Sequence, residues 1–214
     1  MDTLLNNLDI FVIGFRNTLL LFIVSAVVAL VLGTIIGAMR VSPVPVMRAF
    51  GTIYVNLVRN TPLTLIMFFF AFGYPKLGLP TISYLNLATI ALSLYTATYV
   101  AEALRSGINT VPVGQAEAAR AIGLTFGQSM SLVVLPQAFR AVVPPMMNVF
   151  IALLKNTTVA AGFSVAEAGT IRANLSERGE PALVVLLWVA AIFVVLVMIL
   201  SFAQRRLENH WKVA

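Results

Sequence analysis

Long uncharged runs separate the few charged residues of this chain and constrain its fold more than any other feature. These runs cover residues 17–39, 60–75, 77–101, 156–166 and 181–204. A helix needs about 20 mostly apolar residues to cross the hydrocarbon core of a bilayer. The sequence is 60% hydrophobic and 10% charged, whereas about 25% of the residues of soluble domains are charged. We therefore expect an integral membrane protein.

The runs predict helices rather than strands. The period-two alternation of a transmembrane β-barrel is missing, and helices are then the remaining way to cross a bilayer. The expected architecture is an all-α integral membrane domain over residues 1–214 with five transmembrane helices. The expected spans are residues 14–38, 52–73, 86–105, 138–162 and 181–203. Because five helices bury only a small core, an oligomer or a larger complex is expected.

The distribution of Lys and Arg predicts the orientation. Five spans place the two termini on opposite sides, and short loops rich in Lys and Arg face the cytoplasm. One side of the predicted topology carries Arg40, Arg48, Arg105, Arg120, Arg140, Arg205, Arg206 and Lys212. The other side carries Lys76, Arg172 and Arg178. We expect a multi-pass protein of the cell membrane with the N-terminus outside and the C-terminus in the cytoplasm. The net charge of +6 belongs mainly to these loops and gives no reason to invoke nucleic acid.

The central loop, residues 109–137, is predicted to lie in the cytoplasm and to begin with a short helix. Asn109 or Thr110 can cap this helix, and Pro112 suits its first turn. Glu117 then lies near the positive N-terminal end of the helix dipole. The outward residues are small alanines, which permit close approach of another surface. The helix is therefore a candidate docking element.

A second short helix is expected after a turn at Gly123. Thr125 followed by Gln128 has the form of a capping box. From there the helix is predicted to run towards Leu135 and to stop at Pro136. The central loop thus reads as helix, turn, helix.

The same loop resembles the signature of the membrane subunits of ATP-binding-cassette importers. Its sequence matches the spacing EAA, three residues, G, nine residues, aliphatic, any residue, LP. The matching residues are Glu117, Ala118, Ala119, Gly123, Val133, Leu135 and Pro136. The resemblance implies that the first helix is a coupling helix, which sits in a groove of a cytoplasmic ATPase. The alternative is an ordinary amphipathic helix on the membrane surface.

Within the importer family, each of these motif residues has an implied role. Glu117 orients or caps the coupling helix and pairs across the interface with the ATPase. Gly123 allows the sharp turn. Leu135 and Pro136 fix how the chain re-enters the membrane.

Other segments resemble the polar-amino-acid group of these permeases, and together they are similar to glutamate permeases of actinobacteria. The segments are RNTPLTL at 59–65, SGINTV at 106–111, GQAEAAR at 114–120 and KNTT at 155–158. The resemblance implies a type I importer permease fold. It also implies a second permease subunit, identical or paralogous, a dimer of cytoplasmic ATPases and an extracytoplasmic solute-binding protein.

The chain is not expected to be an enzyme. It lacks the GxxxxGK[ST] loop that cradles nucleotide phosphates, so ATP and Mg are expected on the partner ATPase and no cofactor on this chain. The sequence contains no cysteine, and we identify neither catalytic residues nor a metal site.

Two cations fall within the predicted spans. Arg59 and Lys155 each cost about 2.5–3.5 kcal/mol at the centre of a bilayer, so something must offset that cost. Pro62 lacks a backbone N–H, and a kink or local opening is expected just before it. The pair Pro144–Pro145 is expected to break the early part of the fourth span.

These cations and their polar neighbours form the candidate substrate site. The candidate residues are Arg59, Asn60, Thr61, Lys155, Asn156, Thr157 and Thr158. Two cations suit an anionic amino acid, glutamate or aspartate, because its extra carboxylate needs charge-assisted donors. A permease for glutamine or for a basic amino acid is the alternative.

Each candidate also has a structural interpretation. Arg59 can pair with Glu102 or reach the inner headgroups, and Lys155 can cap carbonyls of a broken helix. The Thr and Asn residues can be hydrogen-bond links between helices. Glu102 lies three residues before Arg105 and is predicted to form a structural ion pair with it.

Two other classes of function stay open on the residues alone. A secondary transporter is expected to have more spans or inverted repeats. A scaffold subunit would dock the ATPase without contacting the substrate.

Overall fold

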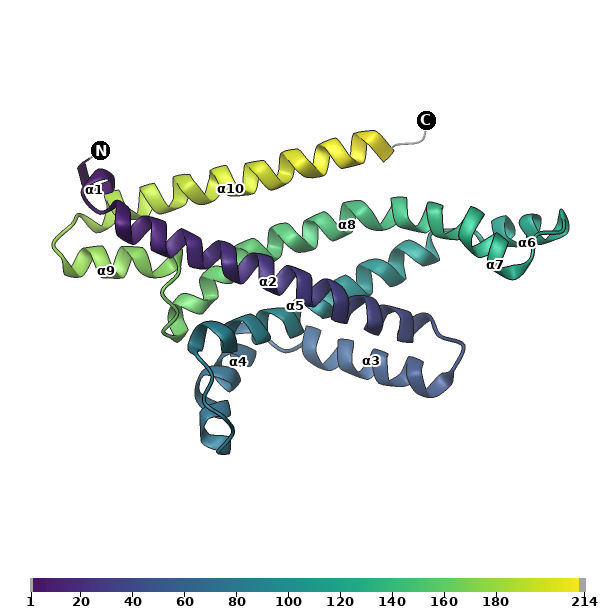
Figure 1. The fold of residues 1–214 in the computed structure, drawn as a ribbon, viewed down its shortest axis with the longest axis horizontal. Coiled ribbons are helices and arrows are strands. Elements are labelled where there is room, and N and C mark those ends of the chain that lie inside the picture. Colours follow the sequence, from purple (N-terminus) through teal and green to yellow (C-terminus); the bar gives the residue numbers. More distant parts are fainter. Residues whose placement is uncertain (1, 212–214) are drawn as a thin grey trace.

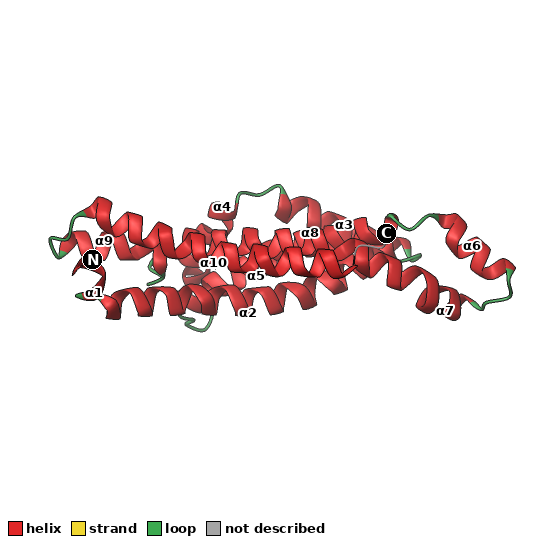
Figure 2. Cartoon of the chain, turned by 90° about the horizontal axis from the view of Figure 1, so that it is seen from above, coloured by secondary structure: helices red, strands yellow, loops and turns green. Residues whose placement is uncertain are grey.

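The computed structural model describes residues 2–211, and the side chains of residues 2–209. Every regular element in this part of the chain is helical (Figure 2), which confirms the all-α prediction. Lys212, which contributes to the predicted orientation, lies outside the described residues.

Long helices run side by side along the molecule (Figures 1 and 2). They are α2 (Leu8–Val41), α5 (Tyr84–Asn109), α8 (Leu135–Asn156) and α10 (Ala182–Trp211). Within residues 2–211, four helical stretches are long and apolar enough to span a membrane, and a bent pair makes a fifth. The four stretches are Leu8–Val41, Tyr84–Asn109, Phe126–Phe163 and Ala182–Asn209.

The bent pair lies where the second span is expected. Its parts are α3 (Pro45–Arg59), α4 (Leu63–Phe68), the π-helix η1 (Phe69–Gly73) and the 3₁₀-helix η2 (Tyr74–Leu77). The two halves meet at 94°, so the second half projects sideways from the bundle (Figure 1). A kink before Pro62 is expected from the sequence, but this bend is far larger. The carbonyl of Val58 still accepts from the backbone N–H of Thr61 at 3.2 Å, and the break leaves it satisfied.

The fourth span is a single helical path, contrary to two expectations from its prolines. It comprises α7 (Phe126–Ser129), the π-helix η3 (Met130–Val134), α8 and the 3₁₀-helix η4 (Thr157–Phe163). The helix does not stop at Pro136, because the π-turn redirects the backbone bonds there: the N–H of Leu135 donates to the carbonyl of Met130. Pro144 and Pro145 lie inside α8 without breaking it, although each removes one backbone hydrogen bond of the helix.

Small residues bring α2 and α5 close together. Gly33 of α2 faces Val100 and Ala97 of α5, and a Cβ atom on Gly33 would lie 2.5 Å from the Cβ of Val100. Ala29, Ala97 and Val100 are fully buried in the core at this crossing. The absence of a side chain at Gly33 therefore sets the distance between the two helices.

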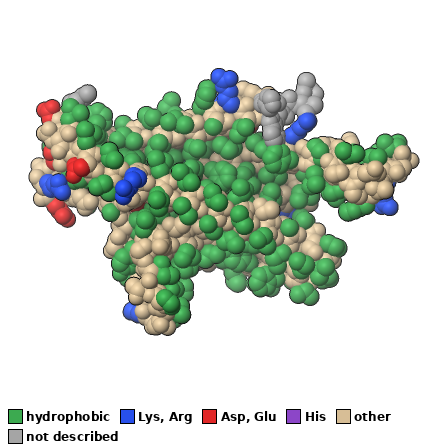
Figure 3. Space-filling model, viewed as in Figure 1, with side chains coloured by type: hydrophobic (Ala, Val, Ile, Leu, Met, Phe, Trp, Pro, Cys, Tyr) green, Lys and Arg blue, Asp and Glu red, His purple; other side chains and the backbone are tan. Residues whose placement is uncertain are grey.

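The two ends of the bundle differ in character. One end carries α6 (Val113–Ala121), α7 and the last turns of α10 (Figure 1). The opposite end carries α1 (Asp2–Leu5), the 3₁₀-helix η5 (Ala168–Thr170) and α9 (Ile171–Glu177). Figure 3 shows hydrophobic side chains over the middle of one face and acidic ones gathered at the opposite end. An apolar exposed middle of this kind is what lipid or a second membrane subunit would cover.

Candidate functional site

The central loop folds as helix, turn, helix and projects beyond the bundle (Figure 1). Gly123 has a φ of +91°, a conformation that favours glycine, so the turn depends on this residue. Thr125 Oγ1 accepts from the N–H of Gln128 at 3.3 Å, and Gln128 Oε1 accepts from the N–H of Thr125 at 2.9 Å. The predicted capping box is confirmed.

The start of α6 differs from the prediction. Pro112, and neither Asn109 nor Thr110, occupies the N-cap position, and no side chain caps the helix. Asn109 ends α5, and Thr110 Oγ1 donates to the carbonyl of Gly107 at 2.6 Å. Thr110 therefore closes the preceding helix instead of opening the next one.

The motif residues divide between an exposed and a buried face of α6. Glu117 and Ala118 are exposed, whereas Ala119 is buried. Leu135 and Pro136 are exposed at the start of α8. The outward face of α6 thus offers one acidic and one small side chain to a partner surface.

Large apolar side chains of the loop, which sequence reasoning missed, are also exposed. Val113 is 74%, Ile122 80% and Phe126 71% exposed. Exposed large apolar side chains of this kind are available as a contact surface. Their signal in the sequence is the occurrence of large apolar residues in an otherwise polar loop.

A cavity of about 310 Å³ lies between α5 and α8. Tyr95 and Tyr99 of α5 are four residues apart, and Asn148, Ala152 and Asn156 of α8 are also spaced by four, so each set shares one helix face. The complete lining is Tyr95, Thr96, Tyr99, Asn148, Val149, Ala152, Leu153 and Asn156. Asn156 was among the predicted site residues. The other polar residues of the wall were missed, although polar side chains spaced by four within apolar spans could have indicated them.

Arg59 is exposed and is not part of the cavity wall, but it contacts Tyr99, which is. Its guanidinium carbon is 5.5 Å from the centre of the Tyr99 ring, and the hydroxyls of Tyr99 and Tyr95 are 2.8 Å apart. The suggested pairing of Arg59 with Glu102 is wrong, because Glu102 binds two other arginines. Across residues 2–209, no carboxylate forms an ion pair with Arg59.

Glu102 joins α2 to α5 through an arginine that sequence reasoning missed. Its Oε2 pairs with Arg40 of α2, and its Oε1 accepts from Arg105 Nη2 at 2.5 Å. The Arg105 pair is the one the sequence predicted. The Arg40 side chain is only 10% exposed, so its charge depends on Glu102. Arg40 and Glu102 both lie near the same predicted membrane boundary, which could have suggested the contact.

The remaining predicted substrate residues do not reach the cavity between α5 and α8. Lys155 and Asn60 are exposed and are not part of its wall. Thr157 is fully buried and Thr158 half-buried, and their hydroxyls donate to carbonyls of their own helix at 2.7 and 2.8 Å. Thr61 Oγ1 does the same towards the carbonyl of Leu57 at 2.8 Å. These threonines satisfy their donors locally.

A model of the family described as binding-protein-dependent transport system inner membrane component matches residues 29–213. The chain belongs to this family. It is 47% identical over 212 residues to the glutamate transport system permease protein GluC of Corynebacterium glutamicum, covering 94% of this chain and 93% of that protein. It is 36% identical over 218 residues to the probable glutamine ABC transporter permease protein GlnM of Bacillus subtilis, covering 99% of each. The predicted membership of the polar-amino-acid group of ABC importer permeases is confirmed.

Solved structures show the same fold. The permease superposes on a chain from the crystal structure of an amino acid ABC transporter with histidines, with a TM-score of 0.91 and 26% identity. That match covers 97% of the permease and 96% of the solved chain. A chain of the MetNI methionine ABC transporter, in an inward-facing conformation, gives a TM-score of 0.78 at 23% identity and covers 96% and 98%. The predicted type I importer permease fold is confirmed.

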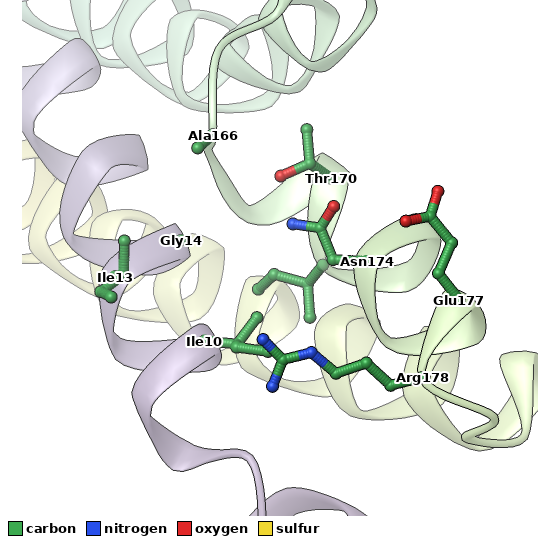
Figure 4. A pocket seen from close by; sticks show the side chains of 9 residues that line it. Ile10, Ile13, Gly14, Ala166, Thr170, Asn174, Glu177 and Arg178 are labelled. Atoms are coloured by element: carbon green, nitrogen blue, oxygen red, sulfur yellow. The ribbon is translucent and has the colours of Figure 1, made fainter.

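A larger cavity, of about 530 Å³, lies at the opposite end of the permease between α2 and α9. Its α2 wall is apolar, with Ile10 and Ile13, while Asn174 and Arg178 of the α9 side reach towards it (Figure 4). Glu177 points away from Arg178 in this view. The cavity is far from the predicted substrate residues of the second span.

A buried carboxyl group lies at the end of the permease opposite the central loop. Glu167 is fully buried, and its Oε2 accepts from Thr18 Oγ1 of α2 at 3.1 Å. Its Oε1 accepts from the N–H of Gly169 at 2.7 Å, and Thr18 Oγ1 in turn accepts from the N–H of Ala168 at 3.0 Å. Glu167 thereby ties the segment before α9 to the first long helix. From the sequence alone, Glu167 is indistinguishable from an exposed acidic residue of a loop.

Burial raises the pKa of Glu167 from 4.5 to about 7, against the lowering effect of its hydrogen bonds. The folded protein then holds a proton that the unfolded chain releases between these two pH values. We expect the stability to fall as the pH rises from about 4.5 to about 7 and to level off above, a change of about 3 kcal/mol. The thermal unfolding midpoint in detergent, measured across this pH range, tests the prediction.

Two variants control that measurement. Glu167→Gln should flatten the pH dependence, while Glu177→Gln, at an exposed position, should leave it unchanged. A midpoint that rises with pH in the wild type, or an equal slope in Glu167→Gln, would contradict the assignment.

Proposed function

We propose that this permease imports glutamate, with aspartate as a related substrate, which a solute-binding protein delivers from outside the cell. The observation that carries the proposal is the Arg59 guanidinium, which has no carboxylate partner among the described residues and lies over Tyr99 at the cavity between α5 and α8. An unpaired guanidinium suits a carboxylate, which it can bind through two parallel hydrogen bonds. The cavity volume of about 310 Å³ falls at the lower end of the range for small-molecule sites. The 47% identity to a glutamate permease supports the same substrate.

ATP drives this import through the central loop. The exposed face of α6 around Glu117 and Ala118 docks a cytoplasmic ATPase, and Val113, Ile122 and Phe126 supply apolar contact area. Two permease subunits, identical or paralogous, dock the ATPase dimer, which alone binds ATP and Mg. The N-terminus then lies outside and the C-terminus in the cytoplasm. ATP shifts the permease towards the outward-facing state only to the extent that the ATPase binds that state more tightly.

Uptake of radiolabelled glutamate, glutamine and arginine by cells tests this function. Deletion of the gene should abolish glutamate uptake and leave arginine uptake intact, and the wild-type gene should restore it. Glu117→Arg should lower glutamate uptake at least about tenfold at an unchanged amount of permease in the membrane, because a reversed charge on the docking face costs at least about 1.4 kcal/mol of coupling.

Glu177→Arg is the matched control, since Glu177 is also exposed but lies at the opposite end. It should transport as the wild type does. Full uptake with Glu117→Arg would mean that α6 is not the docking element, and loss of arginine uptake alone in the deletion strain would exclude the anionic substrate.

Glutamine is the second candidate substrate, favoured by the wall of the same cavity. The wall carries the amides of Asn148 and Asn156 but no charged side chain. Excess unlabelled glutamine should compete poorly with glutamate if Arg59 binds the substrate, and strongly if the amides alone do. A scaffold subunit without a substrate site would give a complex whose substrate preference is insensitive to Asn156→Leu.

A further inference from the structure

The position of Arg59 depends on a helix other than its own. Arg59 is the last residue of α3, immediately before the 94° bend of the second span. The residues that follow turn away from the direction of α3, so no next turn of helix packs against its side chain. The contact that fixes its guanidinium is the ring of Tyr99 on α5.

Tyr99 is itself held in place. Its hydroxyl lies 2.8 Å from that of Tyr95, and the two ring centres are 5.1 Å apart at an interplanar angle of 58°. Both tyrosines line the cavity together with Asn156. A continuous row of side chains therefore leads from the end of α3 into the wall of the cavity.

This arrangement leaves the hydrogen-bonding groups of Arg59 free. Among residues 2–209, no hydrogen bond or ion pair engages the Arg59 guanidinium, and its five N–H groups are therefore available to a ligand. In the tyrosine pair one hydroxyl donates to the other, so one O–H donor of the pair is left over. The guanidinium is the group that can donate to a substrate carboxylate, while the contact between the two hydroxyls holds the Tyr99 ring in place.

We propose that Tyr99, held by Tyr95, is a positioning residue that orients Arg59 towards the side-chain carboxylate of the substrate and so determines the preference for an anionic amino acid. This inference rests on the proposed function. Tyr99 acts through Arg59, and the aromatic face, rather than the hydroxyl, is the part that matters most.

Equilibrium binding of radiolabelled glutamate and glutamine to the purified complex, without the solute-binding protein, tests the inference, because it isolates the membrane site. Tyr99→Leu should weaken glutamate binding about fivefold and glutamine binding much less. Tyr99→Phe, which keeps the ring, should retain most of the glutamate preference. Arg59→Lys, which keeps the charge but loses the planar group, should resemble Tyr99→Leu, and the double variant should lose little more than either single one.

Tyr54→Leu is the matched control. Tyr54 also links α3 to α5, through a hydrogen bond to the carbonyl of Leu94 at 3.0 Å, but does not line this cavity. It should lower the amount of folded complex without changing the glutamate preference.

The outcomes separate the two proposals. A wild-type complex that does not bind glutamate contradicts the proposed function. If the wild type binds glutamate but Tyr99→Leu keeps its affinity and preference, or Tyr99→Phe is as impaired as Tyr99→Leu, the positioning role is overturned and the function stands. Should Tyr99→Leu fail to assemble, the comparison of Arg59→Lys with Tyr99→Phe decides, because only the lysine variant should lose the preference.

Discussion

Replacing Glu102 with alanine is expected to lower the free energy of unfolding by about 3–5 kcal/mol. Glu102 joins α2 to α5 through Arg40 and also binds Arg105. Without the carboxylate, the nearly buried Arg40 keeps its charge but loses its anion. Its Nε already lacks a hydrogen-bond partner in the structure, and loss of Glu102 would remove the carboxylate partner of the same guanidinium as well. Arg105 is 37% exposed and can turn to water.

Denaturant unfolding in detergent, with the amount of permease in the membrane, tests this expectation. The double variant Arg40→Met with Glu102→Leu should recover much of the loss, because removing both charges is far less costly than removing one. Glu177→Ala should have little effect, since that side chain is exposed. A Glu102→Ala protein within about 1 kcal/mol of the wild type would show that the pair does not hold the helices together.

The second large effect is expected at the crossing of α2 and α5. Gly33→Val should lower the free energy of unfolding by about 3 kcal/mol, enough to deplete the folded permease. A Cβ at this position would lie 2.5 Å from Val100 and 2.8 Å from the carbonyl oxygen of Ala97. The second of these atoms belongs to the backbone, so a side-chain movement alone cannot make room.

Gly114→Ala provides the control for that substitution. Gly114 lies in α6, and nothing is within 4 Å of the place a Cβ would take. Alanine is the better helix former there, so the change should be neutral or stabilising by up to about 1 kcal/mol. The thermal unfolding midpoint and the membrane abundance should therefore fall for Gly33→Val and stay equal or rise for Gly114→Ala. Equal losses would mean that packing at the crossing is not what Gly33 provides.

The sequence predicted features that depend on neighbouring residues. Thr125 and Gln128 of the capping box are three residues apart, and so are Glu102 and Arg105. Helix geometry brings residues at this spacing together. The all-helical fold follows from the apolar runs, because a bilayer leaves few alternatives.

The sequence did not predict the contacts that depend on which sides of two helices pack together. The contacts of Arg40 with Glu102 and of Thr18 with Glu167 join residues 62 and 149 positions apart, and hydrophobic periodicity does not specify partners at that distance. The same holds for Arg59 and Tyr99, where the sequence suggested Glu102 instead. The predicted helix end at Pro136 is wrong for a different reason. A proline often ends a helix, but here a π-helical turn before Pro136 lets the helix continue.

The continuous path from Phe126 to Phe163 has a mechanical consequence. Its 38 residues correspond to a rod about 57 Å long, which starts in the central loop and passes the two asparagines of the cavity. A rotation of the rod by about 10° around its midpoint would move each tip by about 5 Å in opposite directions. The central loop and the segment that leads to Glu167 therefore lie at the two tips of one helical path, so a displacement of one tip would be accompanied by an opposite displacement of the other.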